Sequence, residues 1–540
     1  MPTTPAANQP PGNSAEPTRL AGTQGARADQ AQGVGGDATR EAERGAAQEA
    51  GAGAAPRVRA EEAQSTRSGA AQDGRADEAR DVGAGAPPGA HASGTRDARA
   101  NQLQSTTGDA VRDAGPVADV RSAAAGRASG AARLLSSPRV TLPPGLPYAE
   151  RAAGLVGSVI DSSTSLLQKQ EHDIVRLAMG SPAAEAVPTA ILAGIAESAL
   201  ALPDAYDYAA TEGDPPLHAA LLDVLRGTTD ETTADRLTIT AGGMQGLDLF
   251  CKIFVDPGDL VVVESPTYTN GSATALSYGA ELLEVPVDDD GMDVGALEDL
   301  VAATGRTPKA IYTIPTFQNP SGATLSLPRR HRLLELARAW GSMVIDDDPY
   351  GLLRFAGSPL PTIRELAAGD PLVFAVRTFS KIVAPGLRVG WVDTAPELQP
   401  LLISAKQAMD TCTNLPAQRL LTMFLTGGHL TDHLVTQRAE YKRRKEAMHA
   451  ALTEHFGGIA RWTDPDGGFF LWVTLENGVD ATDLFEVALA EGVAYIPGSA
   501  FSPSGRFRDA LRLCFASTPP DRIHEGVARL RRAVDLQAKN

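Results

Sequence analysis

The chain has 540 residues, and its 66 acidic side chains outnumber its 49 basic ones, which gives a formal net charge of −17. This acidic balance disfavours a polyanionic partner such as nucleic acid, and no apolar run has the length of a membrane-spanning helix. The three cysteines, Cys251, Cys412 and Cys514, lie far apart, which favours a reducing compartment over a disulfide framework or a cysteine-based zinc site.

Residues 1–147 differ in composition from the rest of the chain. They contain no Phe, Trp, Tyr, Ile, Lys or Cys. Such a segment cannot bury enough apolar surface to offset the entropy of the chain, so its composition predicts a disordered, low-complexity tail. The start, "MPTTPAANQPPGN", lacks the basic and apolar regions of a secretory signal, so we expect a cytoplasmic protein.

The rest of the chain shows two patterns. From about residue 235, short apolar runs alternate with longer helical patterns, which predicts an α/β fold with a mostly parallel central sheet and helices on both faces. After 430, a long charged helical stretch precedes "GGFFLWVTL", "VAYIPGS" and "ALRLCFA", a pattern typical of a smaller α+β domain. We therefore predict a large domain over 206–430 and a small domain over 431–540, to which the segment 148–205 contributes.

Polar residues follow four of the predicted strands. In sheets of this kind, ligands bind at the carboxyl ends of the strands. "YTIP" leads to Thr316, Gln318 and Asn319, "MVI" to Asp346, Asp347, Asp348 and Tyr350, "FAV" to Thr378, Ser380 and Lys381, and "VVVES" to Thr267 and Tyr268. The sequence therefore predicts a ligand site at this edge of the sheet.

Lys381, in "RTFSKIVAPGLRVGW", lies directly after one of these strands. Burial lowers the pKa of a lysine ammonium and makes the amine available for Schiff-base chemistry. A cofactor of the pyridoxal phosphate type needs such an amine, a carboxylate for its ring nitrogen, donors for its phenolic oxygen, an aromatic face and a phosphate cup. All of these residue types occur at the predicted strand ends.

Four motifs in this region carry a family resemblance. "TFSKIVAPGLRVGW", "PTFQNPSG", "DDDPYG" and "LRLCFA" resemble, in this order, motifs of the fold-type I pyridoxal-phosphate-dependent class I/II aminotransferases. The chain from about 170 to 530 looks like the subgroup of α-aminoadipate and kynurenine aminotransferases. The resemblance implies the type I fold of pyridoxal-phosphate-dependent transferases and pyridoxal phosphate as the cofactor.

The resemblance also implies roles for residues around the cofactor ring. Lys381 would bind the cofactor covalently and later move the proton of the substrate Cα. Asp347 would pair with the pyridinium nitrogen, because it stands three residues before Tyr350 as in the family. Asn319 and Tyr350 would donate to the phenolic oxygen, and Tyr268 would stack on the ring. Asp346 and Asp348, on either side of Asp347, are expected to serve the turn.

A second group of residues resembles the family's phosphate cup. "AGGMQG" at the start of a predicted helix offers the N–H groups of Gly243 and Met244, and Thr378, Ser380 and Arg388 would complete the cup. Many relatives carry Ser where this chain has Gly243 and Thr378, and a backbone donor and a Thr hydroxyl can substitute.

The remaining matches concern the substrate and a second subunit. Arg512 would bind the substrate carboxylate, with Asn319 beside it. Tyr208, in "YDYAATEGDPPL", resembles a tyrosine that reaches the phosphate of the neighbouring subunit, so we expect a homodimer with a shared active site. Asp214 and His218 replace a Tyr and an Arg that are frequent in the family, which leaves the substrate's identity open.

The resulting hypothesis is an aminotransferase that moves an amino group from an L-α-amino acid to a 2-oxo acid, commonly 2-oxoglutarate, by a ping-pong mechanism. A lyase, decarboxylase or oxidase on the same fold is the alternative, since fold does not settle the reaction.

A MocR-like transcription regulator would need a folded DNA-binding module, for which residues 1–147 lack the apolar residues. The nine histidines show no metal-ligand spacing, so no metal site is expected.

Overall fold

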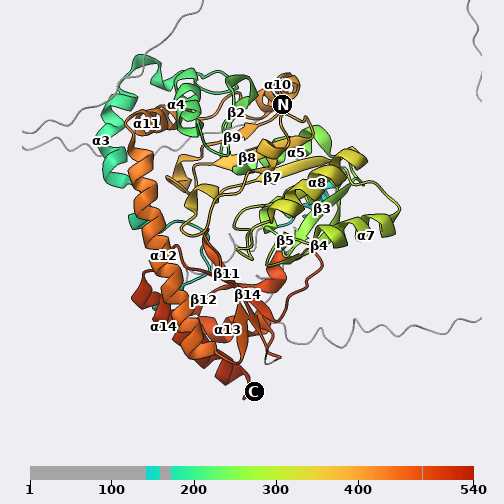
Figure 1. Ribbon diagram of the computed structural model, residues 1–540, viewed down its shortest axis with the longest axis vertical. Coiled ribbons are helices and arrows are strands. Elements are labelled where there is room, and N and C mark those ends of the chain that lie inside the picture. The colour runs from blue at the N-terminus through green and yellow to red at the C-terminus, as the bar shows by residue number, and fades with distance from the viewer. Residues whose placement is uncertain (1–141, 158–171, 477, 540) are drawn as a thin grey trace, which may run out of the picture. The chain divides into compact units, whose positions relative to one another are not determined.

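The computed structural model describes residues 142–157, 172–476 and 478–539 (Figure 1). The predicted tail 1–147 lies outside these residues except for 142–147, so its disorder stays a prediction. In the described parts of the chain, no helix combines the length and the apolar composition needed to cross a membrane.

Among the described residues, eight strands form one mixed sheet in the order β2-β9-β8-β7-β6-β3-β4-β5. Neighbouring strands from β8 to β4 are parallel, whereas β9 is antiparallel to both β2 and β8, and β5 to β4. The strands are β2 Leu237–Thr240, β3 Leu260–Ser265, β4 Glu281–Asp288, β5 Gly291–Met292, β6 Ala310–Thr313, β7 Met343–Asp347, β8 Val373–Thr378 and β9 Gly390–Asp393. The predicted α/β class with a mostly parallel sheet is confirmed.

Both faces of this sheet are buried under helices. Successive strand residues point to opposite faces, so Val261 and Val263 belong to one apolar core and Val262 to another. The first core includes α5 and α10, and the second includes α7 and α8 (Figure 1). The helices around the sheet are α4 Pro215–Leu225, α5 Gly243–Phe254, α6 Thr269–Ser277, α7 Val294–Thr304, α8 Leu327–Trp340, α9 Ile363–Leu366, α10 Gln399–Asp410 and α11 Leu415–Thr426. This two-sided burial explains why the central strands read as continuous apolar runs.

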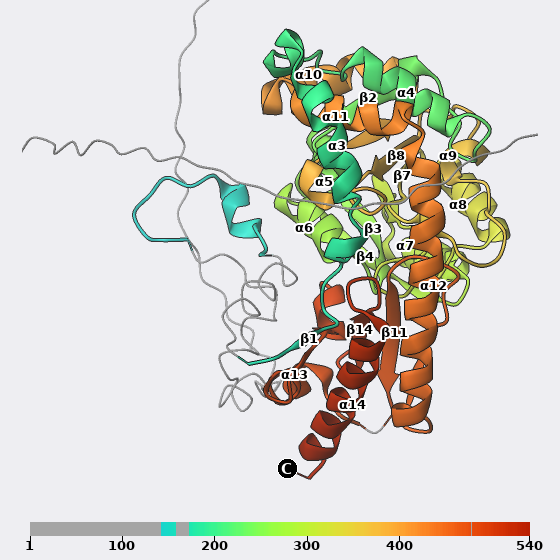
Figure 2. The same ribbon diagram turned by 90° about the vertical axis from the view of Figure 1, so that its left-hand side faces the viewer.

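A second sheet lies in the C-terminal part of the chain. Its strands are antiparallel, in the order β10-β11-β14-β13. The helices α12, α13 and α14 belong to the same part of the chain. The bounds of these elements are α12 His429–Phe456, β10 Ala460–Trp462, β11 Phe470–Leu475, α13 Ala481–Ala490, β13 Ile496–Pro497, β14 Ala510–Cys514 and α14 Pro520–Gln537. A further strand, β12 Val493–Ala494, belongs to a separate two-stranded sheet. The long helix α12 packs against α14, and the two lie side by side (Figure 2).

The described part of the segment 148–205 contacts both halves of the fold. Strand β1, Val175–Arg176, pairs with β12 in parallel, whereas α3, Thr189–Leu200, packs against α11. The large sheet falls within the predicted range 206–430 and the four-stranded sheet within 431–540, and the exact domain boundaries stay predictions.

A buried arginine joins the strands that carry the predicted site. Arg377 of β8 donates to Asp230 Oδ2 at 2.8 Å and to Asp346 Oδ2 at 3.0 Å. Asp346 was expected to serve the turn, but it pairs with Arg377 instead. Asp348 accepts from the N–H groups of Tyr350 and Gly351, as expected for a turn residue. The pair with Asp346 ties β8 to β7, and the pair with Asp230 ties β8 to the segment that follows α4.

Replacing Arg377 by Ala should lower the free energy of unfolding by about 3–5 kcal/mol, because Asp346 would stay buried without its partner. The matched control is Arg332→Ala on the surface of α8, where solvent-exposed ion pairs with Glu298 and Glu335 contribute little to stability. Urea denaturation of both variants measures the difference, and equal losses would contradict the role of Arg377.

Candidate active site

A cavity of about 230 Å³ opens at the carboxyl ends of the central strands. Its walls contain every sequence-predicted site residue except one. Lining it are Gly243, Met244, Tyr268, Asn319, Asp347, Tyr350, Thr378, Ser380, Lys381, Arg388 and Arg512, together with others such as Gly180, Ile314 and Phe470. The exception is Tyr208, which lies outside the cavity and is 81% exposed.

Lys381 follows β8 and projects into this cavity. Its Nζ donates to the carbonyl oxygen of Gly180 at 2.8 Å, and the structure gives it no ion pair with any described carboxylate. Burial lowers the pKa of this amine to about 8, well below the usual value of a lysine. Near neutral pH, much more of the Lys381 amine is therefore unprotonated than of an ordinary lysine, and this free amine can act as a nucleophile.

Asp347 ends β7 and is almost completely buried. Burial raises the pKa of its carboxyl group to about 7, although the Tyr312 hydroxyl donates to Oδ2 at 2.9 Å and opposes this shift. A cationic N–H placed against the carboxylate would restore its charged form. Tyr312 was not predicted, because within an apolar strand a tyrosine looks like an ordinary core residue.

Arg512 is a second cation of the cavity that has no ion pair with any described residue. Its side chain is fully buried in β14, donates to Ala178 O at 2.7 Å and to Asn319 Oδ1 at 3.0 Å, and stacks on Phe470. Its Nε is buried without a hydrogen-bond partner, and no described carboxylate forms an ion pair with Arg512. Burial lowers the pKa of the guanidinium to about 10. Because a buried unpaired cation is costly, the arrangement suits an anionic ligand.

The turn between β2 and α5 forms a cradle at the other end of the cavity. Gly242 has φ 78° and ψ 173°, a conformation open in practice only to glycine. A Cβ at Gly242 would stand 2.7 Å from Nη2 of Arg388. The first N–H groups of a helix lack partners within it, and Gly243 and Met244, which begin α5, line the cavity. Thr378 Oγ1 donates to Ser380 Oγ at 2.9 Å beside the cradle.

Two aromatic side chains complete the walls. Tyr350 is buried and packs against Phe469 and Phe470. Tyr268 stands at the N-cap of α6, and its hydroxyl lies 3.7 Å from the sulfur of Met244. Both tyrosines therefore face the cavity from elements that follow two different strands.

A buried carboxylate holds the loop that carries Asn319. Glu264 of β3 is 1% exposed, and it accepts from Thr313 Oγ1 at 2.6 Å and from Gln318 Nε2 at 3.0 Å. Gln318 in turn accepts from the N–H of Ser321 at 2.8 Å, so both sides of Asn319 are fixed. The role of Glu264 was not predicted, although a glutamate inside the apolar run "VVVES" was a signal for it.

The model of the aminotransferase class I and II family matches residues 172–530. The chain belongs to this family. The predicted type I fold of pyridoxal-phosphate-dependent transferases and the resemblance to aminoadipate and kynurenine aminotransferases are thereby confirmed.

Several aminotransferases are similar over most of their length. Aromatic-amino-acid aminotransferase 1 of Thermococcus litoralis is 38% identical over 73% of this chain and 95% of its own. The 2-aminoadipate transaminase of Thermus thermophilus is 37% identical over 68% of this chain and 91% of its own. The structure of Pyrococcus horikoshii kynurenine aminotransferase in complex with PMP has a TM-score of 0.69 and 36% identity, and covers 73% of this chain and 98% of its own. HTH-type transcriptional regulators are also similar, at 27–32% identity.

Class I and II aminotransferases use pyridoxal phosphate, and the cavity of this member fits that cofactor. A nucleophilic amine, a buried carboxylate and a cradle that a Cβ would fill lie in one space. The buried Nε of Arg512 remains for a further anionic group.

Replacing Gly242 by Ala should weaken pyridoxal phosphate binding, because the new Cβ strains the backbone and displaces Arg388. A strain of about 1–3 kcal/mol corresponds to roughly 5- to 150-fold in affinity. Gly386→Ala is the matched control, since a Cβ there meets no atom within 4 Å. Absorbance titration of the cofactor-free proteins measures both affinities, and an unchanged affinity in Gly242→Ala would refute the cradle.

Proposed function

We propose that this member of the family moves the amino group of an L-α-amino acid to a 2-oxo acid, with 2-oxoglutarate as acceptor, by a ping-pong mechanism. The observation that carries the proposal is Arg512, a fully buried guanidinium without a carboxylate partner among the described residues, in one cavity with Lys381 and Asp347. Such a cation suits the α-carboxylate that donor and acceptor share.

Bound pyridoxal phosphate supplies an aldehyde that captures the substrate amine and a ring that accepts the electrons left when Cα loses its proton. Asp347 would pair with the ring nitrogen and keep it protonated. Asn319 and Tyr350 would donate to the phenolic oxygen, and Tyr268 would cover the ring. Lys381 would hold the cofactor and later carry the Cα proton at Nζ.

The cradle would hold the phosphate. The N–H groups of Gly243 and Met244, the hydroxyls of Thr378 and Ser380, and the guanidinium of Arg388 offer the donors. In the homodimer that we propose, Tyr208 would reach the phosphate of the neighbouring subunit, which gives a reason for its exposure in a single chain.

Arg512 also bears on the choice of reaction. Loss of carbon dioxide from a carboxylate paired with a buried guanidinium would leave that cation without its partner, which disfavours decarboxylation. Lys381, whose amine is partly unprotonated, is available to take the Cα proton instead. These two groups favour transamination over decarboxylation on this fold.

The donor that we propose is a large amino acid of the aromatic, aminoadipate or kynurenine type. The support is the similarity to the enzymes of these names.

A regulatory role has less support, because residues 1–147 lack the apolar residues of a folded DNA-binding module. The free cysteines Cys251, Cys412 and Cys514 agree with the cytoplasmic location that we propose.

The absorption spectrum of the holoenzyme tests the proposal. A donor amino acid without any 2-oxo acid should convert the pyridoxal band into a pyridoxamine band, and 2-oxoglutarate should restore the first band. Lys381→Ala should lose turnover by at least about 10²-fold, since the general base is gone. Release of ammonia or carbon dioxide without a pyridoxamine band would indicate a lyase, oxidase or decarboxylase instead.

The lowered pKa of Lys381 predicts the pH dependence of cofactor uptake. An ammonium must lose its proton before its nitrogen attacks an aldehyde, so uptake by the cofactor-free protein should become faster as pH rises through about 8. Between about pH 7 and pH 9 the rate should rise roughly tenfold and then level off. Stopped-flow absorbance measures the rate, and a continued rise to about pH 10 would show an ordinary lysine.

A further inference from the structure

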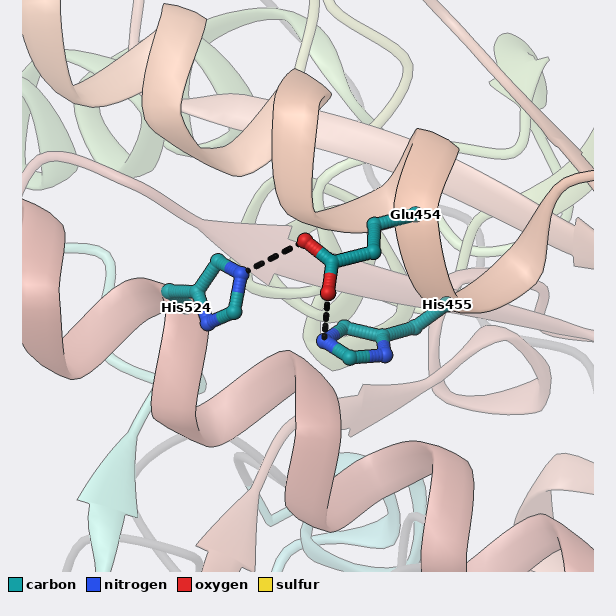
Figure 3. A group of neighbouring side chains, drawn as sticks. All are labelled: Glu454, His455 and His524. Carbon is teal, nitrogen blue, oxygen red and sulfur yellow. Dashed lines mark hydrogen bonds and ion pairs between the residues drawn. The ribbon is translucent and has the colours of Figure 1, made fainter.

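Two histidines and a glutamate meet where α12 packs against α14 (Figure 3). Glu454 and His455 belong to the last turn of α12, and His524 lies near the start of α14. Glu454 Oε2 is 2.9 Å from Nε2 of His524, and Glu454 Oε1 is 3.8 Å from Nε2 of His455. One ligand atom from each of the three side chains lies within 4.8 Å of the other two.

The hydrogen bonding of this cluster is incomplete. His524 is within hydrogen-bonding distance of Glu454, whereas Nε2 of His455 is buried from solvent and has no hydrogen-bond partner. Its distance to the carboxylate is too long for a hydrogen bond. A buried ring nitrogen without a partner costs free energy, and it points at the carboxylate across a gap (Figure 3).

The gap has the size that a small divalent ion requires. Zinc binds histidine nitrogen and carboxylate oxygen at about 2.0–2.2 Å, so two ligand atoms of a tetrahedral site stand roughly 3.3–3.5 Å apart. The 2.9 Å separation, from His524 to Oε2, is shorter than this value, and the 3.8 Å separation, from His455 to Oε1, is longer. The three ligand atoms lie within 4.8 Å of one another, so small side-chain shifts would bring them around one ion. Glu454 and His524 are more than half exposed and can shift slightly, and water can occupy a fourth position.

We propose that Glu454, His455 and His524 form a binding site for a divalent transition-metal ion of the zinc type. Two imidazoles and one carboxylate suit Zn²⁺, Co²⁺ or Ni²⁺ and are a poor set for Mg²⁺ or Ca²⁺, which prefer oxygen ligands. This proposal departs from the expectation of no metal site, which was drawn from the spacing of the histidines, because Glu454 and His524 are 70 residues apart in the sequence.

The site joins α12 to α14 and does not belong to the active site, since none of its three residues lines the cofactor cavity. Nη1 of Arg531 on α14 already donates to the carbonyl oxygen of His455 at 3.0 Å and fixes the end of α12. A bound ion would add a second link between the same two helices. The consequence of binding is therefore stability of the small domain, with no step in catalysis.

The experiment uses the full-length holoenzyme, freed of metal by dialysis against a chelator. Calorimetric titration with ZnCl₂ should show one ion per chain, and saturating Zn²⁺ should raise Tm by roughly 2 °C or more. Co²⁺ should give a visible spectrum typical of nitrogen and oxygen ligands. Absence of both binding and a Tm shift would overturn the proposal.

Three variants assign the ion to this site. His524→Ala changes an exposed residue and should fold normally, yet lose the zinc-induced Tm shift, and His455→Gln should lose it as well. The matched control is His331→Ala, an exposed histidine of α8 that should keep the full shift. Transamination should be unchanged in all three. Zinc binding by His524→Ala equal to that of the unaltered protein would place the ion elsewhere and refute the site.

Discussion

Burial of charged groups in one small space is the constraint on which the rest of this structure depends. Lys381, Asp347 and Arg512 line the same cavity. Burial raises the pKa of Asp347 and lowers the pKa of Lys381 and of Arg512, so it favours the uncharged form of each group. A protein tolerates such a set only if its backbone holds the groups firmly and a ligand supplies opposite charges. The cavity is therefore unfavourable on its own and favourable with an anionic cofactor and substrate in it.

The large sheet provides the firm support. The central strands are buried on both faces, so their carboxyl ends cannot shift independently. Arg377 ties β7 to β8 through Asp346, and Glu264 of β3 holds the loop around Asn319 through Gln318. These hydrogen bonds and ion pairs take no part in the proposed reaction, but they fix the positions of the residues that do.

Both sites that we propose contain a buried nitrogen atom without a hydrogen-bond partner. In the cavity this atom is Nε of Arg512, and between α12 and α14 it is Nε2 of His455. Buried polar atoms are normally satisfied, so an exception next to groups of suitable charge indicates a ligand. At Arg512 the partner that we propose is an anion, and at His455 it is a cation, because the neighbouring group is the carboxylate of Glu454.

The sequence by itself determined the α/β class, the strand ends and the motif residues, since apolar periodicity and turn chemistry are local properties of the chain. It could not show that Tyr312 contacts Asp347, that Glu264 holds the Asn319 loop, or that Asp346 pairs with Arg377. Nor could it bring His524 to Glu454. Only the tertiary structure decided these contacts, because they depend on how strands and helices distant in sequence stack, which no local pattern records.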